Sequence, residues 1–219
     1  MQERPRYIVV EGPVGVGKTS LALILAERLG ARVVLERFED NPFMREFCRD
    51  PKRYAFQMQL FALLGRYQQQ DTLGQEDLFT RGGLVSDFMI AKDRILATVN
   101  LTPAELALHE KIYGILCPRV PRPDLVVYLQ ARTEVLLARL RKRAHESKDG
   151  ETFNPPAEYV EEVARAYRYY FFHYDVSPLL VVNTSEIDFV ASETDRDELV
   201  AVIRKTRAGT QHYIPLAAH

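Results

Sequence analysis

A glycine-rich segment ending in Lys-Thr is the clearest chemical signal near the N-terminus. Residues 12–19 match G-x-x-x-x-G-K-[S/T] at every fixed position. The backbone N–H groups of such a loop surround phosphates, while its Lys reaches the outer phosphates and its Thr contacts Mg²⁺. We therefore expect a nucleotide-binding loop formed by Gly12, Pro13, Val14, Gly15, Val16, Gly17, Lys18, Thr19 and Ser20.

The flanking residues match the structural context that this loop requires. Residues 6–10 are typical of a buried strand, and residues 21–29 of a helix that ends at Gly30. A triphosphate would then lie at the helix N-terminus, where unpaired N–H groups attract anions. A plain turn between strand and helix is the alternative. The loop alone leaves water, a protein or a small molecule open as the phosphoryl acceptor.

Two carboxylates follow predicted strands. Glu36 comes after residues 32–35, and Asp87 ends the strand of residues 84–87. Ligands of open parallel sheets bind beyond the carboxyl ends of the strands, so both acids should share a rim with the phosphate loop. Asp87 is the best candidate to join Thr19 near the metal, whereas Glu36 could also be a solvated strand-end carboxylate. Asp124 precedes its strand and is more typical of a turn.

Polar side chains on an apolar helix form a second candidate set. Gln59 and Arg66 are seven positions apart in the predicted helix 52–67, so they project from the same face. They could face a ligand, or they could be a glutamine at the helix rim and an arginine that extends to solvent. Asp93 begins another helix-like stretch.

A cluster of cations ends the helix predicted over residues 131–143. Arg139 and Arg143 are four positions apart and share a face. Cations favour any helix C-terminus through its dipole, which is the simpler explanation. The polar loop of residues 144–150 could fold over a bound phosphate, however, so we predict a lid over about residues 139–157.

Composition and element order indicate an α/β protein. Five predicted strands alternate with helices (6–10, 32–35, 84–87, 125–129 and 179–183), which predicts a parallel sheet with helices on both faces. The chain has 219 residues, of which 47% are hydrophobic, and this length predicts a single domain spanning residues 1–219.

Charge and cysteine content exclude several classes. The formal net charge of −1 gives no reason to expect nucleic acid or an anionic membrane as partner. Cys48 and Cys117 are far apart and lack histidines at metal-ligand spacing, which argues against zinc or a disulfide. No signal peptide or membrane span is recognisable, so we expect a cytoplasmic protein with small-molecule partners.

Taken together, these segments resemble the deoxynucleoside kinases, particularly the bacterial deoxyadenosine and deoxyguanosine kinases. The similarity runs almost end to end and is carried by residues 11–20, Glu36 with Asn41-Pro42-Phe43, residues 50–66, Val85-Ser86-Asp87 and the lid arginines. It implies a P-loop NTPase-like fold with an arginine-bearing lid. It also implies ATP and Mg²⁺ as cofactors, a deoxynucleoside as acceptor, and a homodimer.

The resemblance assigns roles to individual residues. Glu36 matches the catalytic base and Asp87 the metal-associated acid, while Gln59, Arg66 and Asp93 match residues that recognise the base. Lys18, Arg139 and Arg143 match groups that neutralise the transferring phosphoryl group. Asp188 and Phe189 match the region around the donor adenine, and Glu146 is the carboxylate nearest the position that holds the sugar 3′-hydroxyl.

Three positions depart from the family pattern. Phe88 stands where many members have an arginine after the strand-end acid, Cys48 lies where many have a sugar-contacting tyrosine, and His145 replaces a frequent third lid arginine. Each departure weakens one expected contact, and none removes the base, the metal site or the phosphate loop.

The resemblance implies transfer of the γ-phosphoryl group of ATP to the 5′-hydroxyl of a deoxynucleoside in nucleotide salvage. In the family that the chain resembles, an arginine and an aspartate at the positions of Arg66 and Asp93 go with purine or cytosine acceptors. The resemblance therefore implies deoxyguanosine or deoxyadenosine as the preferred acceptor, leaves deoxycytidine open as another, and predicts poor use of thymidine. A nucleoside monophosphate kinase is one alternative, although it would need further cations for the acceptor's own phosphate. A nucleotide-hydrolysing switch is another, and the sequence has no Asn-Lys-x-Asp motif for guanine.

Overall fold

Short runs of buried β-branched residues form a central parallel sheet. The computed structural model describes residues 6–37, 40–76, 83–146 and 155–215. Within them the sheet has six strands in the order β2-β3-β1-β4-β5-β6, and every pair is parallel. The strands are β1 (Tyr7–Glu11), β2 (Arg32–Val34), β3 (Leu84–Ser86), β4 (Leu125–Gln130), β5 (Leu179–Asn183) and β6 (Thr210–Tyr213).

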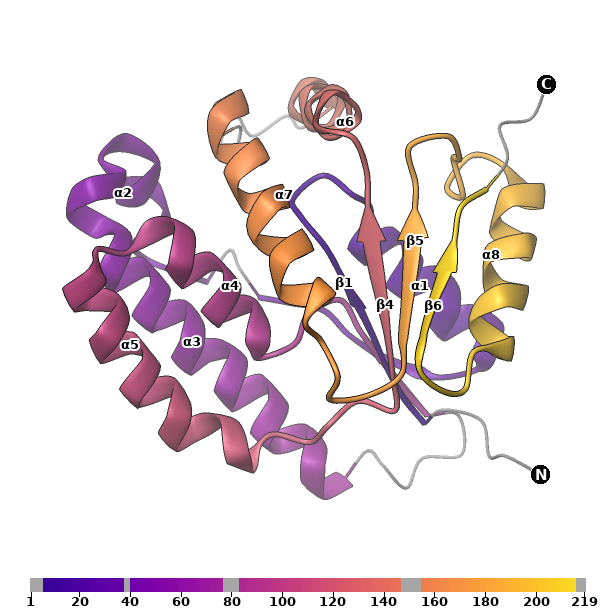
Figure 1. The fold of residues 1–219 in the computed structure, drawn as a ribbon, viewed down its shortest axis with the longest axis horizontal. Coiled ribbons are helices and arrows are strands. Elements are labelled where there is room, and N and C mark those ends of the chain that lie inside the picture. The colour runs from indigo at the N-terminus through magenta and orange to yellow at the C-terminus, as the bar shows by residue number, and fades with distance from the viewer. Residues whose placement is uncertain (1–5, 38–39, 77–82, 147–154, 216–219) are drawn as a thin grey trace.

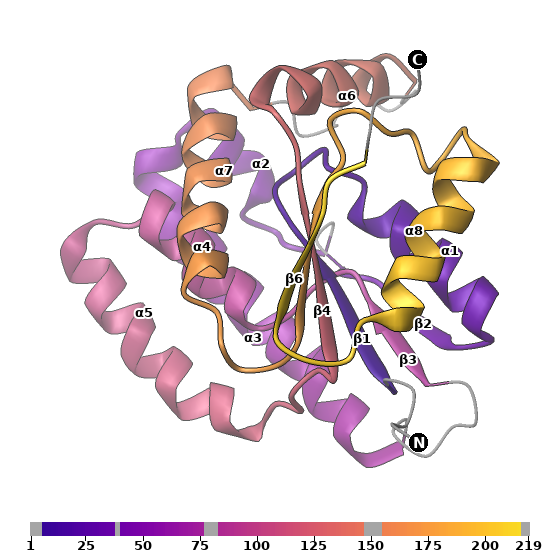
Figure 2. The same ribbon diagram turned by 45° about the vertical axis from the view of Figure 1, so that its right-hand side comes forward.

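Helices cover both faces of this sheet (Figures 1 and 2). One face carries α1 (Lys18–Leu29) and α8 (Glu193–Lys205). The other carries α3 (Pro51–Glu76), α4 (Ala91–Asn100) and α7 (Ala157–Phe172), with α2 (Met44–Arg49) and α5 (Pro103–Leu116) beyond them. A short 3₁₀ turn, η1 (Cys117–Arg119), follows α5, and α6 (Thr133–Glu146) lies across the end of the sheet where β4 leaves it.

The alternation of side chains along β1 separates the two layers. Ile8 and Val10 pack with residues of α1 and α8, whereas Tyr7 and Val9 pack with residues of α4 and α7. Successive strand residues point to opposite faces, and burial on both faces explains why the inner strands β1, β4 and β5 are mostly apolar. The sheet is therefore a buried platform whose carboxyl ends are held in fixed positions.

The parallel α/β fold predicted from the sequence is confirmed, with two differences in its elements. The five-strand prediction was wrong by one strand, because β6 reads Thr-Gln-His-Tyr and lies mostly exposed at the edge beside β5. Its sequence has no apolar run that would have revealed it. The helix predicted over residues 52–67 extends over 26 residues as α3.

Polar residues explain why α3 was underestimated. Its second half contains Gln68, Gln69, Gln70, Asp71 and Thr72, which weakened the periodic apolar signal. Two of these glutamines face inward and bond to other elements, as described below. None of the helices that the structure describes is long and apolar enough to cross a membrane.

Candidate active site at the carboxyl ends of β1, β2 and β3

The phosphate loop connects β1 to α1 through glycines that no other residue can replace without strain. Gly12 has φ 152°, and a Cβ atom there would lie 2.3 Å from the carbonyl oxygen of Leu129. Gly17, at φ 100°, packs against Phe189, whose ring tip would be 2.9 Å from such a Cβ. The Nζ of Lys18 donates to the carbonyl of Pro13 at 3.1 Å across the loop. The N-terminus of α1 therefore faces the concave side of this loop, as anion binding requires.

Asp87 joins the phosphate loop to the segment after β2. Its Oδ2 accepts a hydrogen bond from Thr19 Oγ1 at 2.6 Å, and its Oδ1 accepts one from the backbone N–H of Glu36 at 2.8 Å. The strand-end acids predicted from the sequence thus meet at one rim. Within the described residues no group of three or more His, Cys, Asp or Glu side chains could hold a metal. Thr19 and Asp87 nevertheless provide two hard oxygen ligands, which suits Mg²⁺ because this ion keeps phosphate and water ligands.

Glu36 is the centre of a buried charge cluster formed by Lys92, Glu36, Arg66 and Asp93. Arg66 donates from Nε to Glu36 Oε1 at 2.6 Å, with its Nη2 at 2.5 Å from the same oxygen. Lys92 forms an ion pair with Glu36 Oε2, and Arg66 forms another with Asp93 Oδ1. The four charges alternate in sign along this chain, so each buried charge has an opposite neighbour.

The two carboxylates of the cluster have opposite pKa shifts. Burial raises the pKa of Glu36, but the charges and hydrogen bonds of Arg66 and Lys92 outweigh it and bring the pKa down to about 2. Asp93 is fully buried and shares Arg66 with Glu36, and burial raises its pKa to about 7 despite that cation. Glu36 is thus ionised at any physiological pH, as a group that accepts a proton from an alcohol must be.

The side of the cluster toward α3 contains polar atoms without partners. Among the described residues, both amide atoms of the fully buried Gln59 lack a hydrogen-bond partner, and so does Asp93 Oδ2. Unpaired polar groups of this kind are costly unless a ligand pairs with them. Gln59, Arg66 and Asp93, which the sequence grouped as base-recognition candidates, come from α3 and α4, and these two helices pack together.

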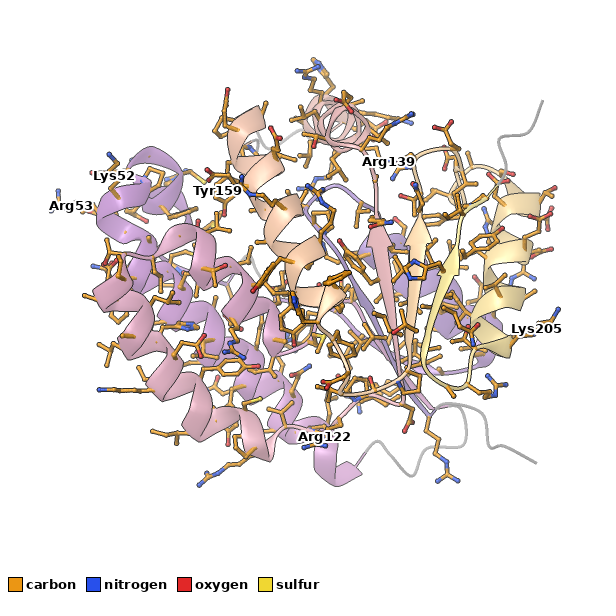
Figure 3. All side chains as sticks on the ribbon, viewed as in Figure 1. Lys52, Arg53, Arg122, Arg139, Tyr159 and Lys205 are labelled. Atoms are coloured by element: carbon orange, nitrogen blue, oxygen red, sulfur yellow. The ribbon has the colours of Figure 1, made fainter. Side chains whose placement is uncertain are left out.

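Arg139 bonds to backbone oxygens on the donor side of the site. From α6 it donates to the carbonyl of Val16 at 3.3 Å, to Oγ1 and the carbonyl of Thr184 at 3.0 and 2.8 Å, and to the carbonyl of Ile187 at 3.2 Å. Figure 3 shows its side chain above the carboxyl ends of β4 and β5. These contacts tie the phosphate loop to the segment after β5. Arg139 therefore positions the loops around the expected donor.

Asp188 and Phe189 lie in that same segment. Phe189 is buried against Gly17, and its carbonyl accepts a hydrogen bond from Arg196 at 3.1 Å. Oδ1 of Asp188 accepts from the N–H groups of Val190 and Ala191 and shapes the turn before α8. The segment is thus fixed next to the phosphate loop, where the resemblance placed the donor base.

The remaining lid candidates lie at the end of α6. Arg143 and His145 are exposed, and Glu146 lies 4.0 Å from Lys142, also at the surface. Residues 147–154 of the predicted lid lie outside the described residues. The structure thus brings Glu36, Arg66, Asp87 and Asp93 together with the phosphate loop, and it does not bring Arg143 or Glu146 into contact with that group.

Sequence reasoning missed several residues that hold the site. Glu11 is fully buried and accepts from the N–H groups of Gly12 and Met89, both at 3.0 Å, and from the hydroxyl of Tyr167 at 3.2 Å. Gln69 donates to the carbonyl of Leu35 at 3.0 Å and accepts from the N–H of Arg37, so it holds the segment around Glu36.

The signals for these residues were weak but present. Glu11 begins the phosphate-loop motif, and Gln69 continues the polar face of α3 at i+3 from Arg66. Lys92 lies directly before Asp93 in the sequence. Its contact with Glu36, just after β2, cannot be predicted from sequence spacing. Such long-range contacts become visible only when the chain is folded.

All three departures from the family pattern lie within the described residues, and His145 is the exposed residue near the end of α6 described above. Phe88 is buried with no exposed surface, so it belongs to the core behind the rim. Cys48 is exposed on α2 as a free thiol, and Cys117 is also free.

Comparison with known proteins agrees with this arrangement. The profile described as "Deoxynucleoside kinase" matches residues 8–207. The chain is 30% identical over 205 residues to a deoxyguanosine kinase of Bacillus subtilis, covering 91% of this chain and 96% of that protein. It is 28% identical to a deoxyadenosine kinase of Lactobacillus acidophilus, covering 90% and 94% of the two chains.

A solved structure shows the same fold. The deoxyadenosine kinase of M. mycoides with bound dATP superposes with a TM-score of 0.74 at 24% identity, covering 90% of this chain and 97% of that one. The phosphate loop, the strand-end acids and the inward-facing helix side chains are therefore found in a chain whose relatives phosphorylate deoxynucleosides. The chain is a kinase and belongs to the deoxynucleoside kinase family.

Proposed function

We propose that this kinase transfers the γ-phosphoryl group of ATP to the 5′-hydroxyl of a purine deoxynucleoside in nucleotide salvage. The observation that carries this proposal is the position of Glu36, an ionised carboxylate whose backbone is bonded to Asp87 and whose side chain is held by Arg66. One hydrogen bond thus separates the candidate base from the candidate metal ligand.

The residues divide the reaction between them. Glu36 takes the proton of the 5′-hydroxyl as that oxygen bonds to the γ-phosphorus, and the bond to the β–γ bridging oxygen breaks with its electron pair left on ADP. The transition state is loose, so orientation and charge matter more than the basicity of Glu36. Lys18 and the N-terminus of α1 bind the phosphates, and Thr19 and Asp87 would hold Mg²⁺, which neutralises the charge that develops on them.

The unpaired groups around Arg66 support selection of the base. Gln59 can both donate and accept, and Asp93 Oδ2 is free to accept a hydrogen bond. A purine edge would pair with these groups, whereas thymine would leave some of them unpaired and would place its methyl group among charges. A site built from buried hydrogen-bonding groups rejects a poorly matched ligand strongly.

Arg143 and Glu146, at the end of α6, are proposed to contact the substrates from the predicted lid. Arg143 would approach the phosphates when the lid closes, and Glu146 would approach the sugar 3′-hydroxyl. Their exposure at the end of α6 supports this, because neither side chain is committed to the protein core.

We also propose a homodimer formed through α5 and α7. Both helices carry large exposed apolar side chains: Leu108 (49% exposed), Ile115 (67%), Tyr169 (72%) and Phe172 (86%). Large apolar side chains that stay exposed on the chain alone are the groups that a subunit interface would bury.

An acceptor panel tests the proposed reaction. ADP release is measured with ATP and Mg²⁺ in the presence of each of the four deoxynucleosides, of their 5′-monophosphates, or of no acceptor, and the product is identified by ³¹P NMR. We expect deoxyguanosine or deoxyadenosine to give the highest kcat/KM, with thymidine lower by at least about 10²-fold. Faster reaction with monophosphates would instead indicate a nucleoside monophosphate kinase. An equal rate without acceptor would indicate a nucleotide-hydrolysing switch.

A further inference from the structure

The residue directly after Asp87 carries no charge that could act at this rim. This residue, Phe88, is fully buried. One helical turn later, in the first turn of α4, Lys92 is 9% exposed, which is unusual for a lysine. A buried lysine needs a compensating partner, and the partner shows where its charge acts.

The ion pair of Lys92 places its ammonium group against the candidate base, Glu36. It is ion-paired with Glu36 Oε2, whereas Arg66 occupies Oε1. Its charge also lowers the pKa of Lys18, second in effect to burial, and offsets part of the rise in the pKa of Glu11. Lys92 is therefore close enough to influence both ends of the phosphate loop.

The two cations on Glu36 are not equivalent. Arg66 also binds Asp93 and is fixed by two carboxylates on the side of the unpaired Gln59. The only ion pair of Lys92 among the described residues is with Glu36. Arg66 is therefore held in place by both carboxylates. Lys92 can instead move from Glu36 to another anionic oxygen, because Glu36 keeps its ion pair with Arg66 and no other carboxylate loses a partner.

From this arrangement we propose that Lys92 is a catalytic residue that moves its charge from Glu36 to an oxygen of the transferring phosphoryl group. The proposal rests on the proposed function, because it requires Glu36 and the phosphoryl group to meet at this rim. The family resemblance described above gives Lys92 itself no role.

This movement of Lys92 would help both the proton transfer to Glu36 and the transfer of the phosphoryl group. When the ammonium group of Lys92 leaves Oε2, that oxygen is free to accept the 5′-hydroxyl proton, and Glu36 becomes more basic because one of its two cations has left. The same ammonium group then lies beside the phosphoryl oxygens while the new O–P bond forms and the bond to ADP breaks. A positive charge at this point stabilises the transition state more than the ground state.

The test compares Lys92→Met with Lys92→Arg. Methionine keeps the length of the side chain and removes its charge, while arginine keeps the charge. We expect kcat with ATP and deoxyguanosine to fall at least about 10²-fold in Lys92→Met, with KM for deoxyguanosine changed less than about threefold. Lys92→Arg should retain kcat within about tenfold of the parent. Lys205→Met, at an exposed position at the end of α8, is the matched control.

The pH profile separates this role from a structural one. In the parent, Glu36 carries two cations, and its low pKa keeps the acid limb of kcat/KM out of the neutral range. In Lys92→Met one cation is lost, so the acid limb should move to higher pH, while Lys92→Arg and Lys205→Met should leave it unchanged. Thermal melts of each variant confirm folding.

Two results would overturn the proposal. One is turnover of Lys92→Met within threefold of the parent with an unmoved acid limb. The other is an equal loss in Lys92→Arg and Lys92→Met, which would mean that charge is not what matters. The parent is assayed with the same acceptors, so the two proposals can fail separately. If only the Lys92 proposal is wrong, the parent phosphorylates the deoxynucleoside and the two Lys92 variants are either active or equally impaired. If the proposed function is wrong, the parent itself does not phosphorylate a deoxynucleoside.

Discussion

At the scale of single residues, the site depends on four buried charges rather than on isolated functional groups. Removing one member of a buried ion pair typically costs about 3–5 kcal/mol because the other charge is left unpaired. Arg66 and Lys92 hold Glu36 ionised, whereas burial, together with the nearby charge of Glu36, drives Asp93 toward its neutral form although it also binds Arg66. The residues that select the base and the residue that accepts the proton therefore influence one another.

Asp93 should make stability depend on pH. Its pKa is raised to about 7 by burial, which Arg66 only partly offsets, whereas the unfolded carboxyl group ionises near about pH 4. Stability from this group is therefore complete below about pH 4 and is lost as pH rises toward 7. Asp93→Asn stays neutral, so its Tm relative to the parent should increase from pH 5 to pH 8.

Thermal melts at both pH values check this, with Asp197→Asn on the surface of α8 as the matched carboxyl-to-amide control. A difference in Tm between Asp93→Asn and the parent that is the same at pH 5 and pH 8 would show that Asp93 keeps an ordinary pKa in the folded protein.

At the scale of elements, Asp87 connects three segments. It follows β3, accepts from Thr19 at the start of α1, and accepts from the backbone after β2. Asp87→Asn should lower turnover at low Mg²⁺ by at least about tenfold and recover part of it as Mg²⁺ is raised, because the carboxylate is assigned to the metal. Rates are measured over a Mg²⁺ titration. An identical loss at every Mg²⁺ concentration would make Asp87 a purely structural link.

The contacts of Arg139 lead to a different expectation from that for Arg143. Arg139→Ala removes bonds to Val16, Thr184 and Ile187 that fix the donor side, so KM for ATP should rise about tenfold with a smaller change in kcat. Arg143→Ala should act mainly on kcat, because its charge is used when the lid closes.

Steady-state kinetics with varied ATP separate the two, and Arg141→Ala on the exposed face of α6 is the control. If Arg139→Ala lowers kcat alone and leaves KM for ATP unchanged, Arg139 acts on the transferring group rather than on the donor loops.

The elements also show how far sequence patterns extend. The phosphate loop and the acids after β2 and β3 were predictable, because motif spacing and strand ends are local features. The strand β6 was not, since an exposed edge strand has no apolar pattern. Lys92 and Gln69 were not predictable either. Each acts through a contact with the end of β2 that arises only when α3 and α4 pack against the sheet.

At the scale of the whole molecule, the exposed apolar side chains of α5 and α7 should determine the oligomeric state. Tyr169 and Phe172 form ring contacts with His173 at the end of α7, at 4.7 and 5.1 Å between centroids. Phe172→Ser should weaken the proposed dimer at least about tenfold while leaving the folded chain intact, because Phe172 is 86% exposed. Sedimentation velocity over a concentration series measures this, and an unchanged association state would place the interface elsewhere.

The fold class and family were predictable for the whole molecule because they depend on the order of elements and on motifs that are spread along the chain. The charge pairing of the site was not, since Lys92, Glu36, Arg66 and Asp93 come from three separate segments. The lid stays a prediction. Part of its predicted range lies outside the described residues, since α6 ends at Glu146 and the description resumes at residue 155.

The central claim is that Glu36 accepts the proton of a deoxynucleoside hydroxyl during phosphoryl transfer. The most direct measurement is the initial rate of ADP release with deoxyguanosine for the parent and for Glu36→Gln, with ATP affinity determined on the same samples. The account predicts a rate that depends on deoxyguanosine in the parent and falls at least about 10²-fold in the variant, while ATP affinity stays nearly unchanged. Turnover of Glu36→Gln within a few-fold of the parent would contradict it.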